Sequence, residues 1–175
     1  GYPNGLFTEN ACNYVKAIFP DFTVKEREEM LSRAMDYAVA HGVTSVQSND
    51  IGTSVLDVPT YFNMFHRFYD EGKGLLRYRH QVCFNNLNDF KEYIEEGEYV
   101  KGKYDEDSWL TLGPLKLFKD GSLGARTAMM KHEYYDEPGN YGIEWISNED
   151  MEQYCDLALK ANMQVVTHVI GDAAI

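Results

Sequence analysis

Short β-branched segments alternate with longer amphipathic helical patterns along the chain, and this alternation restricts the fold more than any other feature of the sequence. Strands are predicted over 43–47, 75–84, 112–118 and 163–169. Consecutive strands recur roughly every 30 to 50 residues with a helix between them, which is typical of parallel strands joined by crossover helices. We therefore expect an α/β fold with a parallel sheet.

Capping residues mark the ends of the predicted helices. Thr23 and Glu26 form a predicted capping box, and Gly42 is the expected left-handed cap of the same helix. Its apolar face is expected to include Ala34 and Met35. Helices are predicted over 8–19, from the capping box to Gly42, from Pro59 to near Gly72, over 87–96, and over 147–161 with Ser147 as N-cap.

The composition excludes several classes of protein. The formal net charge of -12 predicts no nucleic-acid partner and no anionic membrane partner, since both require a basic footprint. No apolar stretch approaches the roughly 20 residues of a membrane span, and no signal peptide is visible. The three cysteines form no CxxC pair and are expected to be buried free thiols, which fits a cytoplasmic protein.

Lys116 is expected near the C-terminal end of a buried strand, where α/β barrel enzymes carry out their chemistry. Side-chain alternation places Lys116, Phe118 and Asp120 on one face of this strand and Lys119 on the other. An isolated ammonium is costly to bury. Lys116 is therefore either salt-bridged, or extended to water, or carbamylated by CO2 to give a carboxylate that bridges two metal ions.

A second strand end carries His168, followed by Gly171 and Asp172. His168 is either a hydrogen-bonded core residue or, as a neutral imidazole, a metal ligand. Asp120 and Asp172 each stand beside a glycine, and their simplest role is to form turns. The backbone N–H groups of residues 122–124 are a weak candidate for an anion cradle.

The longest stretch without a helical or strand period runs from 121 to 146. Loops longer than about 15 residues in a compact domain are usually either functional or disordered. This one contains Tyr134, Tyr135, Tyr141 and Trp145. We therefore expect an ordered active-site loop that shapes a substrate pocket.

Two runs of residues carry a resemblance to a known family. One is Lys-x-x-x-Asp-Gly-Ser-Leu-Gly-x-Arg-Thr-Ala from Lys116 to Ala128, and the other is His-x-Ile-Gly-Asp-x-Ala from His168 to Ala174. Together they closely resemble the amidohydrolase superfamily, specifically its family 3 (YtcJ-like) branch. The segments 5–11, 42–46 and 135–142 also resemble that family, so the resemblance covers nearly the whole chain.

The resemblance implies a metal-dependent hydrolase on a TIM (β/α)8 barrel. In the family a His-x-His pair ends strand one, a lysine ends strand four, histidines end strands five and six, and an aspartate, the expected general base, ends strand eight. Lys116 and His168 match strands four and five. The His-x-His pair is absent, so we expect residues 1–175 to be one fragment of the barrel, about strands two to five. Lys119 and Ala173 depart from the small residue and the arginine usual in the family.

The resemblance also implies a divalent metal, with zinc expected, as one or two ions in the whole protein. The expected reaction is hydrolysis of a C–N bond in an amide, formamide or cyclic amide. In a binuclear site a carbamylated Lys116 would bridge the ions. The expected substrate contacts are Asp120, Gly121, Ser122 and Arg126, and no catalytic residue is assigned within this chain.

A fragment of this kind has physical consequences. A catalytic zinc needs three protein ligands, so we expect the isolated chain to bind metal weakly, if at all, and to lack hydrolytic activity. Exposed sheet edges and apolar surface predict self-association. Two alternatives stay open: a flavodoxin-like small-molecule binding module in which Ser122 and Gly124 contact an anion, and a non-catalytic barrel domain used for assembly.

Overall fold

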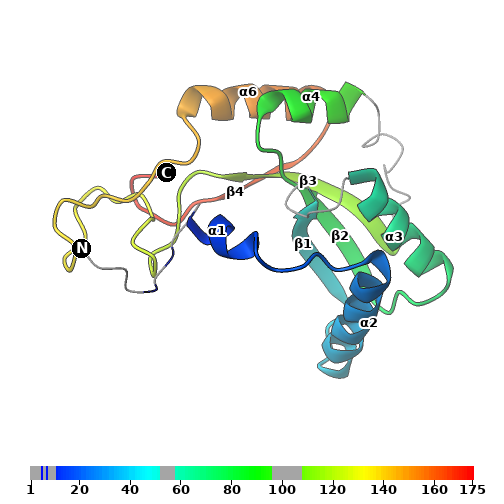
Figure 1. Cartoon of the computed structure of the whole chain (residues 1–175). Helices are drawn as coiled ribbons and strands as arrows, with labels where there is room; N and C mark the ends of the chain where they lie inside the picture. The colour runs from blue at the N-terminus through cyan, green and yellow to red at the C-terminus, as the bar shows by residue number, and fades with distance from the viewer. Residues whose placement is uncertain (1–4, 6, 8–10, 52–57, 96–107) are drawn as a thin grey trace.

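Helices and strands alternate in the computed structural model, which describes residues 5, 7, 11–51, 58–95 and 108–175 (Figure 1). The strands are β1 (Ser45–Ile51), β2 (Arg77–Val82), β3 (Leu110–Phe118) and β4 (Val165–His168). The helices are α1 (Cys12–Lys16), α2 (Val24–Ala40), α3 (Val58–Asp70), α4 (Leu87–Glu95) and α6 (Asn148–Lys160).

The four described strands form one parallel sheet in the order β1-β2-β3-β4. Each connection between neighbouring strands contains a helix, as the alternation predicts. The α/β prediction is therefore confirmed. A sequential strand order is that of a (β/α) barrel, whereas a flavodoxin-like sheet reverses its direction of growth after the first strand. The observed order contradicts the flavodoxin-like alternative.

Local sequence signals explain where α2 begins and ends. Thr23 and Glu26 hydrogen-bond each other reciprocally through side chain and backbone, which is the predicted capping box. Gly42 follows the helix with φ of 80°, as the predicted left-handed cap. On the predicted apolar face Met35 is buried, but Ala34 is exposed because the sheet and α3 lie against the other side of the helix.

Two predicted elements differ from the structure. The strand predicted over 43–47 begins at Ser45 and continues to Ile51, because Ser48 and Ile51 pair with β2 across a polar segment. Of the helix predicted over 8–19, residues 8–10 lie outside the described residues. In the described part the α-helix ends at Lys16, because α1 buries no side chain and so lacks packing to extend it.

The apolar core lies between the sheet and the helices. Strand residues such as Ile51, Val82 and Leu115 are fully buried and pack against aromatic side chains from the helices. These aromatic residues come from α3, α4 and α6: Tyr61, Phe62, Phe65, Phe90, Tyr93 and Tyr154. Helices α4 and α6 lie side by side across the top of Figure 1. The core therefore fixes β3 firmly, and with it the residues at its C-terminal end.

The cysteines Cys12, Cys83 and Cys155 are free, as predicted, but they are half-buried and not fully buried. Burial still raises the thiol pKa of Cys83 and Cys155, which keeps them in the unreactive protonated form. Across the described ranges, no helix combines the length and the apolar character that a membrane crossing requires.

Candidate functional site

Lys116 and His168 lie on the same face of the sheet, at the C-terminal ends of neighbouring strands. His168 pairs with Phe118 in the β3–β4 register, and their rings lie 5.5 Å apart. The Lys116 Nζ lies 4.9 Å from the centroid of the Phe118 ring. Phe118 therefore contacts both residues that the sequence predicts as metal ligands, and the structure brings all three to one edge of the sheet.

Lys116 is half-buried. Among the residues that the structure describes, no carboxylate forms an ion pair with it. Its ammonium lies instead over the Phe118 ring, an arrangement that a cation favours. Among the described residues the salt-bridge interpretation therefore has no support, and the placement agrees with a charged lysine near water. Carbamylation of Lys116 stays a prediction.

The imidazole of His168 is oriented by a backbone carbonyl. Its Nε2 lies 2.7 Å from the Gly121 oxygen, and a carbonyl oxygen only accepts, so Nε2 carries the proton of the neutral ring. Metal-binding histidines commonly donate their second ring N–H to such a carbonyl, which fixes the tautomer. In this structure that leaves Nδ1 as the atom with a lone pair for a metal ion.

Lys116 and His168 together would form only part of a metal site. Within the described ranges, no group of three or more histidine, cysteine, aspartate or glutamate side chains is placed to hold an ion. A catalytic zinc takes three protein ligands and leaves a fourth position open. Lys116 and His168 therefore supply two candidate ligands, and further ligands would have to come from outside the described residues.

Asp120 lies just after β3 and is only 1% exposed. Its carboxylate accepts backbone hydrogen bonds from Met129 (2.9 Å), Ile170 (2.9 Å) and Gly171 (2.6 Å). Burial raises the Asp120 pKa, but these three bonds outweigh burial and hold the pKa below its ordinary value. The carboxylate thus joins the loop after β3 to the loop after β4; its contact with substrate stays a prediction.

The segment from Gly121 to Thr127 folds back on itself. Gly121 N donates to the Thr127 carbonyl at 3.1 Å, and Ser122 N donates to Thr127 Oγ1 at 3.0 Å. Both N–H groups are satisfied within the turn. An anion cradle that uses the Ser122 N–H is therefore not formed in this structure, because the Thr127 side chain occupies that donor.

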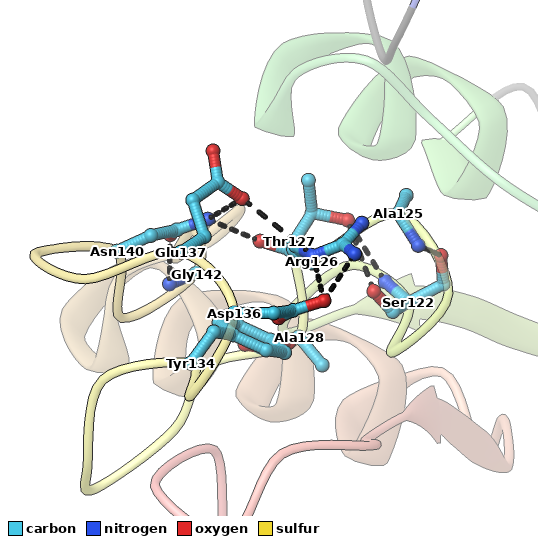
Figure 2. A network of polar contacts seen from close by, with 10 residues as sticks. All are labelled: Ser122, Ala125, Arg126, Thr127, Ala128, Tyr134, Asp136, Glu137, Asn140 and Gly142. Atoms are coloured by element: carbon cyan, nitrogen blue, oxygen red, sulfur yellow. Dashed lines mark hydrogen bonds and ion pairs between the residues drawn. The ribbon is translucent and has the colours of Figure 1, made fainter.

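Arg126 has a left-handed φ of 57°, which is uncommon for a residue other than glycine. Its Nε lies 3.0 Å from Asp136 Oδ2 and 3.9 Å from the Glu137 carboxylate. Its carbonyl accepts a hydrogen bond from Asn140 Nδ2 at 2.9 Å. Figure 2 shows how these contacts gather the 121–146 loop around Arg126. The guanidinium is paired inside the loop, so its contact with substrate also stays a prediction.

A groove of about 510 Å³ lies at the C-terminal ends of β2 and β3. Its walls come from Phe84 and Asn85 after β2, from Lys116 and Phe118, and from Trp145 at the end of the long loop. Small-molecule sites have volumes of about 300 to 1,000 Å³. The groove is therefore large enough to accept a small ligand beside Lys116.

Sequence reasoning missed a buried polar cluster around Asp50. The Asp50 carboxylate accepts hydrogen bonds from Ser48 Oγ (2.6 Å), Tyr61 OH (2.5 Å) and Tyr78 OH (2.7 Å), and His80 Nδ1 lies 3.1 Å away. These side chains join β1, β2 and α3 on the helix-covered side of the sheet. The available signal was a histidine within the strand predicted over 75–84, but Asp50, Ser48 and Tyr61 lie in separate segments of the sequence.

Comparisons with known proteins agree with this architecture. The sequence pattern of the Amidohydrolase family matches residues 1–175. The chain is 32% identical to Protein LONG AFTER FAR-RED 3 of Arabidopsis thaliana and 28% identical to YtcJ of Bacillus subtilis (strain 168), with 99% of this chain aligned to each. These alignments cover 30% and 31% of the relatives, so the chain spans about a third of their length.

Solved structures show the same fold. A crystal structure described as an uncharacterized metal-dependent hydrolase from Pyrococcus horikoshii OT3 matches with a TM-score of 0.74 and 25% identity, over 99% of this chain and 35% of that chain. A second such hydrolase, from Pyrococcus furiosus, matches with a TM-score of 0.74 and 24% identity, over 99% of this chain and 36% of that chain.

Sequentially ordered parallel strands, helices between them, and a lysine and a histidine at the C-terminal edge define part of a TIM-type barrel of the hydrolase class. The family match covers all 175 residues and identifies the class of hydrolase: the chain belongs to the amidohydrolase family.

Proposed function

We propose that residues 1–175 are part of a longer metal-dependent hydrolase that cleaves a C–N bond of an amide, formamide or cyclic amide. The observation that carries this proposal is the placement of Lys116 and His168 at one strand edge, with His168 held by the Gly121 carbonyl. Family membership supports the hydrolase class. The bond type is what the resemblance of this chain to the amidohydrolase family implies.

The residues of this chain hold and orient the reacting groups. His168 Nδ1 and Lys116, the latter as a carbamate in a binuclear site, would hold one or two divalent ions, with zinc as the expected metal. When bound, such an ion activates water and polarises the scissile carbonyl. The groove beside Lys116, which Phe118 also lines, would accept the acyl or amide group of the substrate.

The proposal is tested with the full-length protein that contains this chain. Hydrolysis of simple amides and N-formyl compounds is followed before and after chelation, and again after zinc is restored. We expect chelation to abolish hydrolysis, zinc to restore it, and Lys116→Ala to remove it, while the exposed Lys160→Ala leaves it unchanged. Hydrolysis that persists in Lys116→Ala at the wild-type rate would refute the assignment of Lys116.

A further inference from the structure

Lys119, the residue after β3 and three positions beyond Lys116, is 4% exposed. Its Nζ donates hydrogen bonds to Glu144 Oε1 (2.6 Å), Ile146 O (2.9 Å) and Asn148 Oδ1 (2.7 Å). An ammonium has three donors, and all three are used. This full set of acceptors explains how the chain tolerates a buried lysine at this position.

All three acceptors come from one short segment, the end of the 121–146 loop and the first residue of α6. The backbone adds a fourth link, because Trp145 N donates to the Lys119 carbonyl at 2.9 Å. Lys119 therefore makes four hydrogen bonds to residues 144–148. As alternation predicts, Lys119 lies on the helix-covered face of β3. It makes these bonds on the face opposite to Lys116.

The segment that Lys119 holds contains one wall of the groove. Trp145 is 48% exposed and lines the groove together with Phe84, Phe118 and Lys116. Trp145 therefore borders the groove, and its backbone N–H is bonded to β3 through the Lys119 carbonyl. Without the three Lys119 side-chain bonds, Glu144 and Asn148 would lose their link to the end of β3, and Trp145 between them would be held less firmly beside Lys116.

We propose that Lys119 is a positioning residue that fixes Trp145 as the aromatic wall of the Lys116 groove and so gives the groove a preference for amides with a flat aromatic acyl group. The choice of an amide as the ligand rests on the proposed function, whereas the positioning of Trp145 by Lys119 does not. An aromatic pair adds about 0.5 to 1.5 kcal/mol to binding. The expected preference is therefore roughly two- to tenfold.

The test measures ligand binding to the full-length protein without metal, so it does not depend on hydrolysis. The probes are benzamide and acetamide, which share the carboxamide and differ in the ring. Protein labelled with 5-fluorotryptophan is titrated with each probe and followed by fluorine NMR, and the Trp145 resonance is assigned by its loss in Trp145→Phe. We expect benzamide to shift that resonance and to bind roughly two- to tenfold more tightly than acetamide.

Lys119→Met keeps the length of the side chain and removes all three donors. We expect it to bring the benzamide-to-acetamide ratio close to about one, as Trp145→Ala also does, while the exposed Lys160→Met keeps the wild-type ratio. A general loss of folded protein would lower both affinities and leave the ratio unchanged. A wild-type ratio in folded Lys119→Met overturns the proposal.

A second variant covers the case in which Lys119→Met does not fold. Glu144 is half-exposed, so Glu144→Ala removes one acceptor of Lys119 with little cost to the fold. It should lower the ratio part of the way, and an unchanged ratio would count against the proposal. Hydrolysis is measured separately. A wild-type protein that hydrolyses amides but binds benzamide and acetamide equally rejects this inference alone, and a wild-type protein that prefers benzamide but hydrolyses no amide rejects only the proposed reaction.

Discussion

At the scale of single residues, Asp50 shows how a buried carboxylate is kept ionised. Its side chain is 25% exposed and is surrounded by donors from Ser48, Tyr61, Tyr78 and His80. Burial raises the Asp50 pKa, but the contacts with His80, Ser48 and Tyr61 outweigh it and hold the pKa well below its ordinary value. The stability that this charge contributes is therefore complete only at a pH above the pKa of the same carboxyl in the unfolded chain.

Asp50→Asn should destabilise the protein by about 2 to 3 kcal/mol at pH 7, because an amide cannot accept from all four neighbours. Since the folded pKa is depressed, this advantage of the wild type is complete above the unfolded pKa of about 3.9 and shrinks as the pH falls below it towards the folded pKa. Urea unfolding of both proteins between pH 7 and pH 3 measures the difference.

The exposed Asp36→Asn is the matched control and should change stability by less than about 0.5 kcal/mol at every pH. A difference between wild type and Asp50→Asn that stays constant down to pH 3 would mean that the Asp50 charge does not stabilise the fold.

Sequence reasoning found Lys116 and His168 because each stands at the end of an apolar run, a pattern that is local. It did not find the partners of Asp120, Arg126 or Asp50. The donors to Asp120 include residues 50 and 51 positions away, and such pairing depends on how the loops meet after the strands are in place. Arg126 was assigned to substrate from its motif, whereas its loop carboxylates became visible only in three dimensions.

At the scale of elements, the 121–146 loop has a defined structure without a helix or a regular strand. Tyr134 OH donates to Ala128 O at 2.8 Å, and Asn140 Oδ1 accepts from Gly142 N at 2.8 Å. Figure 2 shows these links around the Arg126 ion pair. The prediction of an ordered loop is therefore confirmed, while its role at an active site stays a prediction.

Gly142 is the position in this loop at which a side chain would be least tolerated. It has φ of 86°, and a Cβ there would lie 2.0 Å from the Ala128 carbonyl oxygen. Gly142→Ala should therefore destabilise the protein by more than about 1 kcal/mol, because both the backbone conformation and the contact are unfavourable. Thermal unfolding measured by calorimetry gives the change.

Gly124 of the same loop is the matched control. A Cβ at Gly124 meets nothing within 4 Å, and its φ is not in the left-handed region. Gly124→Ala should be neutral within about 0.5 kcal/mol. Equal effects of the two substitutions would show that the loop is not packed as described.

Elements with strong local signals were predicted well, and elements held by tertiary contacts were not. The Thr23 capping box and the Ser147 cap fix the starts of α2 and α6 from local hydrogen bonds alone. The second half of β1 is polar, and it is a strand only because β2 pairs with it. No local pattern contains that information.

At the scale of the whole molecule, we propose that the isolated chain self-associates. Within the described sheet β1 and β4 each have a single neighbour, and open sheet edges favour pairing between chains. Large apolar side chains such as Ile18 and Phe19 are also exposed. We expect light scattering to give a mass above the 20.1 kDa of one chain that rises with concentration. A monodisperse monomer would contradict this expectation.

The metal content of purified protein tests most directly whether the C-terminal strand edge is a metal centre that this chain only partly forms. We predict that the full-length protein retains about one or two zinc ions after dialysis, that His168→Asn lowers its zinc affinity by at least about tenfold, and that the isolated 175-residue chain retains almost none. Unchanged zinc affinity in full-length His168→Asn, or tight stoichiometric zinc in the isolated chain, would contradict the account.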